Sequence, residues 1–143
     1  MTDRPDSLLR VLHTVRTLGY ADVPRIAARP AVEACYRDFL PLNDVVARAC
    51  SDWQLAELGI GGKQTSLEDT VAELRRAADA WEPLEHRLAG DVERFAGYLG
   101  RFTGALAHAV HDPRWITGTD RDSAHRVWFE LHEDLIATLG LSR

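Results

Sequence analysis

The apolar side chains between residues 32 and 53 recur at steps of three and four, which is the spacing of one side of an α-helix. Because this stripe is rich in aromatic rings, it predicts a long helix with one buried face. Pro41 lies within the stripe, so we expect either a kink or two helices that meet at Leu40, since proline removes a backbone donor. The stripe consists of Val32, Cys35, Tyr36, Phe39, Asn43, Val46, Cys50 and Trp53.

Asn43 is the polar member of this stripe and follows Pro41 by two positions. A buried amide without a partner costs roughly 1–3 kcal/mol, so Asn43 needs protein, water or a ligand to pair with. Our first interpretation is that the amide binds backbone groups released at Pro41, because most buried polar groups are satisfied within the protein.

A second helix is predicted to open at Ser66, which together with Asp69 resembles a capping box, and to reach Gly90. Pro83 is expected to break or restart this helix. Its apolar face is Leu67, Val71, Leu74, Ala78 and Trp81, continued by Leu84 and Leu88.

Two further apolar stripes follow, and a loop at residues 115–119 is expected between them. The first stripe is Val92, Phe95, Leu99, Phe102, Leu106 and Val110, with Tyr98 and Ala105 on its flank. The second stripe belongs to a helix that Asp120 or Asp122 is expected to cap and that ends at Gly140. Its apolar positions are Ala124, Val127, Trp128, Leu131, Leu135 and Leu139.

The N-terminal segment has its own stripe, which consists of Leu8, Val11, Leu12, Val15 and Leu18. This stripe predicts a helix that stops at Gly19, and Pro24 is placed to begin a short second helix. Such a pair is typical of the opening of a helix-turn-helix, but the next helix begins at Pro30 and leaves no room for a recognition helix and a wing. We therefore divide the chain into a helix-turn-helix-like remnant at residues 1–29 and a helical domain at residues 30–143.

No stretch shows the alternation of a β-strand, so the expected fold class is all-α, a single-domain bundle of about five to seven helices without a sheet. The chain has 143 residues, which suits one core, and a formal net charge of −5. No apolar run approaches the about 20 residues that span a bilayer, and no secretory signal is present. We expect a soluble cytoplasmic protein without a membrane partner.

The residue pattern does not indicate a metal, cofactor or phosphate site. Cys35 and Cys50 lie about 22 Å apart on a continuous helix, far beyond the about 7 Å limit of a disulfide, and are expected to be reduced core residues. The glycines before Lys63 lack the spacing and the preceding strand of a phosphate loop. The helical histidines and glutamates do not form the Glu-x-x-His pairs of di-metal bundles; they are His108, His111, His125, Glu130, His132 and Glu133.

Aromatic and polar side chains gather on the predicted inner faces. Pockets for small molecules are typically apolar, contain a few placed polar groups and often lie between helices. The alternative is that the rings simply fill the core to native density. The expected pocket lining is Tyr36, Trp53, Trp81, Tyr98, Phe102, Trp128 and Phe129, with Asn43, Tyr98 and His132 as polar contacts.

Three motifs resemble actinobacterial regulators of the MarR type. They are Tyr-Arg-Asp-Phe-Leu-Pro-Leu-Asn at residues 36–43, Ser-Asp-Trp-Gln at residues 51–54, and Trp-Phe-Glu-Leu-His-Glu-Asp-Leu-Ile-Ala-Thr-Leu-Gly at residues 128–140. The likeness covers most of residues 31–143, and that family joins an N-terminal winged helix-turn-helix to an all-helical C-terminal domain. The resemblance implies a transcriptional regulator whose helical part serves effector binding or dimerisation.

Three hypotheses about function follow. The first is a regulator-derived protein, expected as a homodimer, that binds a small, largely apolar organic ligand and has lost or weakened its DNA contact. The second is a cofactor-independent enzyme for proton transfer, cyclisation or rearrangement, with His132 or Glu130 as general base or acid and Tyr98 and Asn43 orienting the substrate. The third is a helical module that binds a partner protein.

Overall fold

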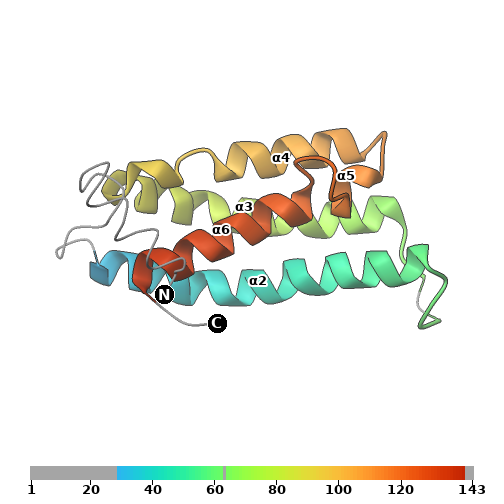
Figure 1. The fold of residues 1–143 in the computed structure, drawn as a ribbon, viewed down its shortest axis with the longest axis horizontal. Coiled ribbons are helices and arrows are strands. Elements are labelled where there is room, and N and C mark those ends of the chain that lie inside the picture. The colour runs from blue at the N-terminus through green and yellow to red at the C-terminus, as the bar shows by residue number, and fades with distance from the viewer. Residues whose placement is uncertain (1–28, 63, 141–143) are drawn as a thin grey trace.

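The computed structural model describes residues 29–62 and 64–140, and in these residues it contains five α-helices, one short 3-10 helix and no strand (Figure 1). The all-α prediction is therefore confirmed. The helices predicted within residues 1–28 lie outside the described residues. The elements are α2 (Arg29–Glu57), α3 (Leu67–Asp91), η4 (Glu93–Phe95), α4 (Tyr98–Ala109), α5 (Arg114–Thr117) and α6 (Ala124–Leu139).

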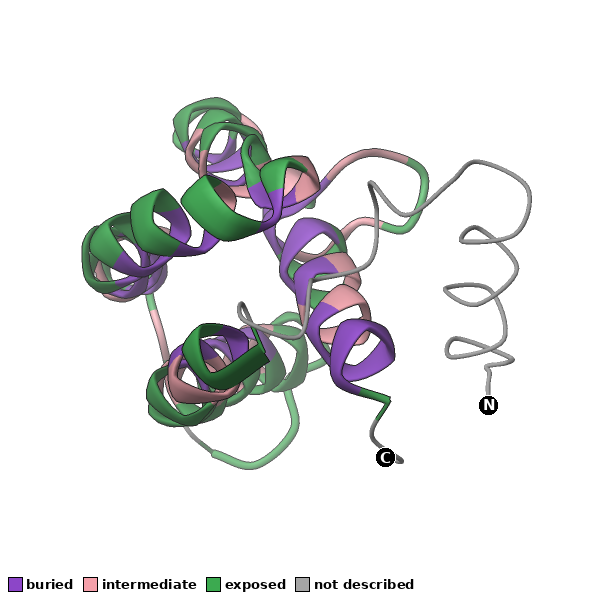
Figure 2. Ribbon diagram, turned by 90° about the vertical axis from the view of Figure 1, so that its left-hand side faces the viewer, coloured by how far each residue is buried: buried purple, intermediate pink, exposed green. Residues whose placement is uncertain are grey.

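Helices α2, α3, α4 and α6 lie side by side and alternate in direction (Figure 1). Each of them packs on two others, α2 on α3 and α6, and α4 on α3 and α6. The view along the bundle shows their buried sides turned towards a shared centre (Figure 2). The described residues thus form an antiparallel four-helix bundle, the arrangement that short connections between amphipathic helices favour. None of the described helices is long and apolar enough to cross a membrane.

Both proline-containing helices are continuous. Pro41 lies within α2 and Pro83 within α3, so the predicted junction at Leu40 does not occur and the predicted break at Pro83 is wrong. Both prolines are on the exposed side of their helix. The carbonyl oxygens that lose their helical donor, four residues earlier, belong to the exposed residues Arg37 and Asp79, where water can serve them.

The connection between α4 and α6 is more ordered than the predicted loop. Residues 114–117 form α5, the side chain of Asp112 accepts a hydrogen bond from Arg114 N at 3.1 Å, and Ile116 is buried. Val110, expected at the end of an inner stripe, is 49% exposed because α4 ends at Ala109. The helix therefore ends one residue before Val110, and the side chain of Val110 does not join the buried side of α4.

Two serines cap the long helices. Ser66 Oγ accepts a hydrogen bond from Asp69 N at 3.0 Å, which confirms the predicted N-terminal cap of α3. The predicted aspartate cap of α6 is wrong, because Ser123 Oγ accepts from Arg126 N at 3.3 Å and donates to Gly118 O at 2.8 Å. Asp120 and Asp122 instead bind the guanidinium groups of Arg121 and Arg101.

Glu85 of α3 holds the beginning of α4. Its Oε1 accepts hydrogen bonds from Trp81 Nε1 at 3.0 Å and Leu99 N at 2.8 Å, and its Oε2 accepts from Gly97 N at 3.2 Å. The carboxylate is almost fully buried, yet it receives three donors and faces the positive end of the α4 dipole. Gly97 adopts φ +114°, a conformation that glycine tolerates and other residues rarely adopt.

We predict that Glu85→Ala lowers the free energy of unfolding by about 1–3 kcal/mol, because the substitution leaves a buried indole N–H and two backbone N–H groups without their acceptor. Urea denaturation followed by circular dichroism measures this loss. The matched control is Glu82→Ala, an exposed glutamate on the same helix. Equal stabilities of the two variants would show that the buried carboxylate does not hold α4.

Candidate functional site

The candidate site lies where α2 and α6 meet, and its first contact is between Asn43 and Trp128. The indole Nε1 of Trp128 donates to Asn43 Oδ1 at 3.1 Å. The amide thus pairs with a side chain 85 residues away rather than with the backbone near Pro41, so our first interpretation of Asn43 is wrong. The amide nitrogen of Asn43 supplies two further donors. Since Asn43 is half-buried, these donors lie near the surface of the bundle.

The aromatic rings at the centre of the bundle pack on one another. The ring centroids of Phe39 and Trp128 are 5.1 Å apart in a stacked arrangement, and Trp81 meets these two rings edge-on at 5.7 Å and 6.2 Å. Phe102 lies 5.2 Å from Trp128 on the other side. These are contact distances for aromatic pairs, so the rings fill the space between them. Trp81, Phe102 and Trp128, expected to line a hollow, are buried members of a packed core.

Tyr36 and His132 form the margin of this core between α2 and α6. Their ring centroids are 6.4 Å apart with an interplanar angle of 27°, and both rings lie against Phe39, at 6.3 Å and 5.3 Å. Both side chains are half-buried. We use the name aromatic margin for Tyr36, Asn43 and His132, three predicted site residues that the structure brings together over Phe39 and Trp128.

Tyr98 lies on another side of α6 and does not join the aromatic margin. Its hydroxyl donates to Asp134 Oδ2 at 2.8 Å, and Asp134 Oδ1 also accepts from Arg94 Nη2 at 2.9 Å. Asp134 and His132 are two positions apart, which places them about 200° apart around the helix. Burial, together with the neighbouring Asp134 carboxylate, raises the pKa of the Tyr98 hydroxyl above its ordinary value.

Glu130 also faces away from the aromatic margin. Its carboxylate accepts from Arg101 Nη2 at 3.0 Å and lies 3.7 Å from Arg126 Nε. Arg101 is bidentate to Asp122 and holds the pKa of that carboxyl below its ordinary value. Glu130 thus faces α4 while His132 faces α2, so the structure does not place the two hypothesised catalytic residues at one reacting atom.

Trp53 and Phe129 are the remaining residues of the predicted lining. Trp53 is half-buried ten residues beyond Asn43, about 15 Å along α2, and its Nε1 is buried with no hydrogen-bond partner among the described residues. Phe129 is 49% exposed on the outer side of α6, so its predicted place inside the bundle is wrong. Being next to Trp128 in sequence, it points about 100° away from the core.

Neither cysteine is arranged as a nucleophile. Cys35 and Cys50 are free and buried, as predicted from their spacing. Burial raises the pKa of the Cys35 thiol to about 11 and that of the Cys50 thiol to about 12, so both stay protonated at neutral pH. Across the described part of the chain, no group of three or more His, Cys, Asp or Glu side chains could hold a metal ion.

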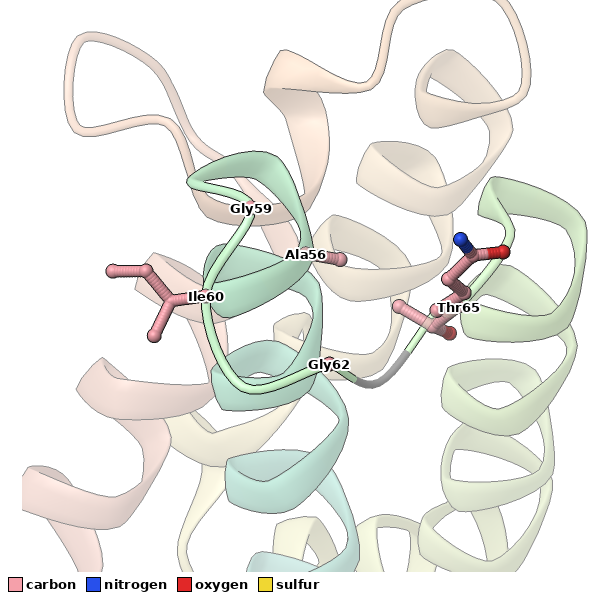
Figure 3. A pocket seen from close by; sticks show the side chains of 6 residues that line it. Ala56, Gly59, Ile60, Gly62 and Thr65 are labelled. Atoms are coloured by element: carbon pink, nitrogen blue, oxygen red, sulfur yellow. The ribbon is translucent and has the colours of Figure 1, made fainter.

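A hollow of about 390 Å³ lies beneath the glycine-rich loop that joins α2 to α3 (Figure 3). Gly59, Gly61 and Gly62 all have positive φ angles, which the tight path of this loop requires. The lining is Ala56, Gly59, Ile60, Gly62, Gln64 and Thr65. Figure 3 shows the side chain of Ile60 pointing away from the loop, and no charged group is among these lining residues, so they do not make a phosphate site.

No protein family, curated protein or solved structure matches this chain significantly. The resemblance to MarR-type regulators therefore stays a prediction from the sequence motifs.

The bond between Tyr98 and Asp134 predicts a pH dependence of stability. Because the pKa of Tyr98 is raised in the folded state, the folded protein keeps this proton at a pH where the unfolded chain, with a tyrosine pKa of about 10, releases it. The stabilisation that the protonated Tyr98 hydroxyl contributes to the folded state is complete below a pH of about 10. It is lost as the pH rises above that value. Urea denaturation between pH 8 and pH 11.5 measures the loss, which we expect to be smaller in Tyr98→Phe. Tyr36→Phe is the control, and identical pH profiles of the wild type and Tyr98→Phe would contradict the prediction.

Proposed function

We propose that this chain is a regulator-derived helical domain that binds a small, largely apolar organic molecule at the aromatic margin. The observation that carries the proposal is the stack of Tyr36 and His132 on Phe39, with Asn43 on the same side of α2. Half-buried rings offer flat apolar surface to a ligand, and a few polar groups beside them fix its orientation.

The polar groups of the aromatic margin suit a ligand that carries one or two hydrogen-bonding atoms. Asn43 is held in place by Trp128, so its amide nitrogen can present donors in a fixed direction. Tyr36 contributes a hydroxyl and His132 contributes imidazole nitrogens. A planar aromatic or polycyclic molecule with a carbonyl or hydroxyl group matches this combination best.

The packed centre sets the position of the ligand in this proposal. Since Phe39, Trp81 and Trp128 are in mutual contact, a ligand enters at the margin beside them rather than between them. Trp128 is then close enough to sense the ligand, because its indole is bonded to Asn43. Binding would therefore change the fluorescence of this tryptophan.

The DNA part of the proposal follows from the sequence resemblance together with the residue pattern of the N-terminal segment. A duplex is recognised by a helix or ribbon placed in a groove, and the residue pattern between Leu8 and Ala28 predicts only the first two helices of such a module. We propose that DNA binding has been lost or weakened. Tight, salt-sensitive and sequence-selective binding of the protein to its own upstream DNA would show this part wrong.

We predict that native mass spectrometry of the protein purified from its own host detects a retained organic molecule, and that retention falls at least about tenfold in His132→Ala and Asn43→Ala, an energetic loss of about 1.4 kcal/mol. The same spectra report the oligomeric state. His125→Ala, an exposed histidine on the same helix, is the matched control and should retain the ligand as the wild type does. Equal retention in all three variants would remove the aromatic margin as the site.

A further inference from the structure

Two buried tryptophans connect the aromatic margin to the beginning of α4. Trp128 of α6 and Trp81 of α3 pack edge to face, with ring centroids 6.2 Å apart and an interplanar angle of 71°. Trp128 is 4% exposed and Trp81 is 1% exposed, so the core encloses both rings. We call Trp81 and Trp128 the tryptophan pair.

Each indole of the tryptophan pair is held at its nitrogen by one side chain. Nε1 of Trp128 donates to Asn43 Oδ1 at 3.1 Å, and Nε1 of Trp81 donates to Glu85 Oε1 at 3.0 Å. A hydrogen bond with defined geometry fixes the orientation of a ring that apolar contacts alone leave freer. A change at one indole nitrogen therefore alters the surface that meets the other ring, and a close-packed interior transmits such a change.

Glu85 connects Trp81 to the backbone of α4. The same Oε1 that binds Trp81 accepts from Leu99 N at 2.8 Å, and Oε2 accepts from Gly97 N at 3.2 Å. The carboxylate cannot follow a shift of Trp81 without lengthening one of these bonds. Because Gly97 provides no side-chain cap, the docking of the first turn of α4 depends on the position of Glu85.

The backbone before α4 allows this first turn to dock and undock. Gly97 has a φ of +114°, and Ala96 before it is extended. Beyond its chain neighbours, no atom of the described residues lies within 4 Å of the position that a Cβ would take on Gly97. The junction thus has room to move, and the Glu85 carboxylate holds it in the docked position.

We propose that the aromatic margin and the first turn of α4 are energetically coupled through the tryptophan pair and Glu85. A molecule that binds the amide nitrogen of Asn43 restricts the rotation of that amide and strengthens its bond with Trp128. The ordered indole then holds Trp81 and Glu85 in place, so an occupied margin stabilises the start of α4. Coupling is reciprocal, so a docked α4 favours binding in turn. The ligand part of this inference rests on the proposed function, whereas the coupling itself is a property of the unoccupied protein.

Amide-proton exchange of the full chain, followed by NMR without a ligand, tests the coupling. Asn43→Ala removes the acceptor of Trp128 and should speed the exchange of the Leu99 amide at least about fivefold. The control is Cys50→Ala, a core variant two turns further along α2 that leaves both indole bonds in place. This control should change Leu99 exchange less than about twofold, because it lowers global stability without releasing Glu85. Equal acceleration in the two variants would show a general loss of stability and overturn the coupling.

A double-mutant cycle measures the same coupling in the unfolding equilibrium. Glu85→Gln keeps the length of the side chain but replaces one carboxylate oxygen by an amide donor, so it breaks part of the connection to α4. The combined effect of Asn43→Ala and Glu85→Gln on the unfolding constant should differ from the product of the single effects by at least about fivefold. Ser66→Ala removes a cap about 28 Å from Glu85 along α3 and should combine additively with Asn43→Ala.

Additive losses for Asn43→Ala and Glu85→Gln, or an unchanged exchange rate of the Leu99 amide in Asn43→Ala, would overturn the coupling. Both measurements use the protein without a ligand. Because ligand retention tests the proposed function separately, a failed coupling and a failed ligand site are distinguishable.

Discussion

The stacked contact between Phe39 and Trp128 is the interaction on which the rest of the bundle depends. These rings come from α2 and α6, the first and last described helices, and their contact closes the ring of four helices. Trp81 of α3 and Phe102 of α4 both pack on Trp128, so one indole is in contact with all three other long helices. Because such a ring buries a large apolar surface, its loss would affect every helix pair at once.

Polar contacts on two sides of α6 fix the rotation of that helix around its axis. On the side of α4, Arg94 and Arg101 bind Asp134 and Glu130. On the side of α2, Asn43 binds the indole of Trp128. Apolar packing alone tolerates small rotations, whereas hydrogen bonds with defined geometry do not. The same rotation that seats Trp128 in the core therefore places His132 beside Tyr36 and leaves Phe129 on the outside.

The regular part of the fold could be predicted because a three-and-four spacing determines which side of a helix is buried. That spacing predicts the buried side of α2, including Phe39, and the inner stripe of α6. It could not show that Pro41 and Pro83 stay within continuous helices, because that outcome depends on both prolines facing water. The same spacing also assigned Phe129 and Val110 to the interior, because the spacing of apolar residues does not show where a helix ends or how it is rotated.

The site could be predicted only in part, because partners far apart in sequence are decided by tertiary packing. The stripe indicated that Asn43 needs a partner but could not identify Trp128. The burial of Glu85 was not predicted, because a glutamate in a helix is ordinarily a surface residue. Its spacing of four from Trp81 was the available signal, since residues at that distance lie on the same side of a helix.

The position of Glu85 makes α3 and the first turn of α4 a single cooperative unit. Gly97, at the start of α4, has no side chain that could accept hydrogen bonds from the first N–H groups of the helix. The acceptor is instead the Glu85 carboxylate of the preceding α3. The opening turn of α4 can therefore persist only while α3 is folded and docked. Local fluctuations that release one of these two segments will release the other, and hydrogen exchange in both should proceed through the same opening event.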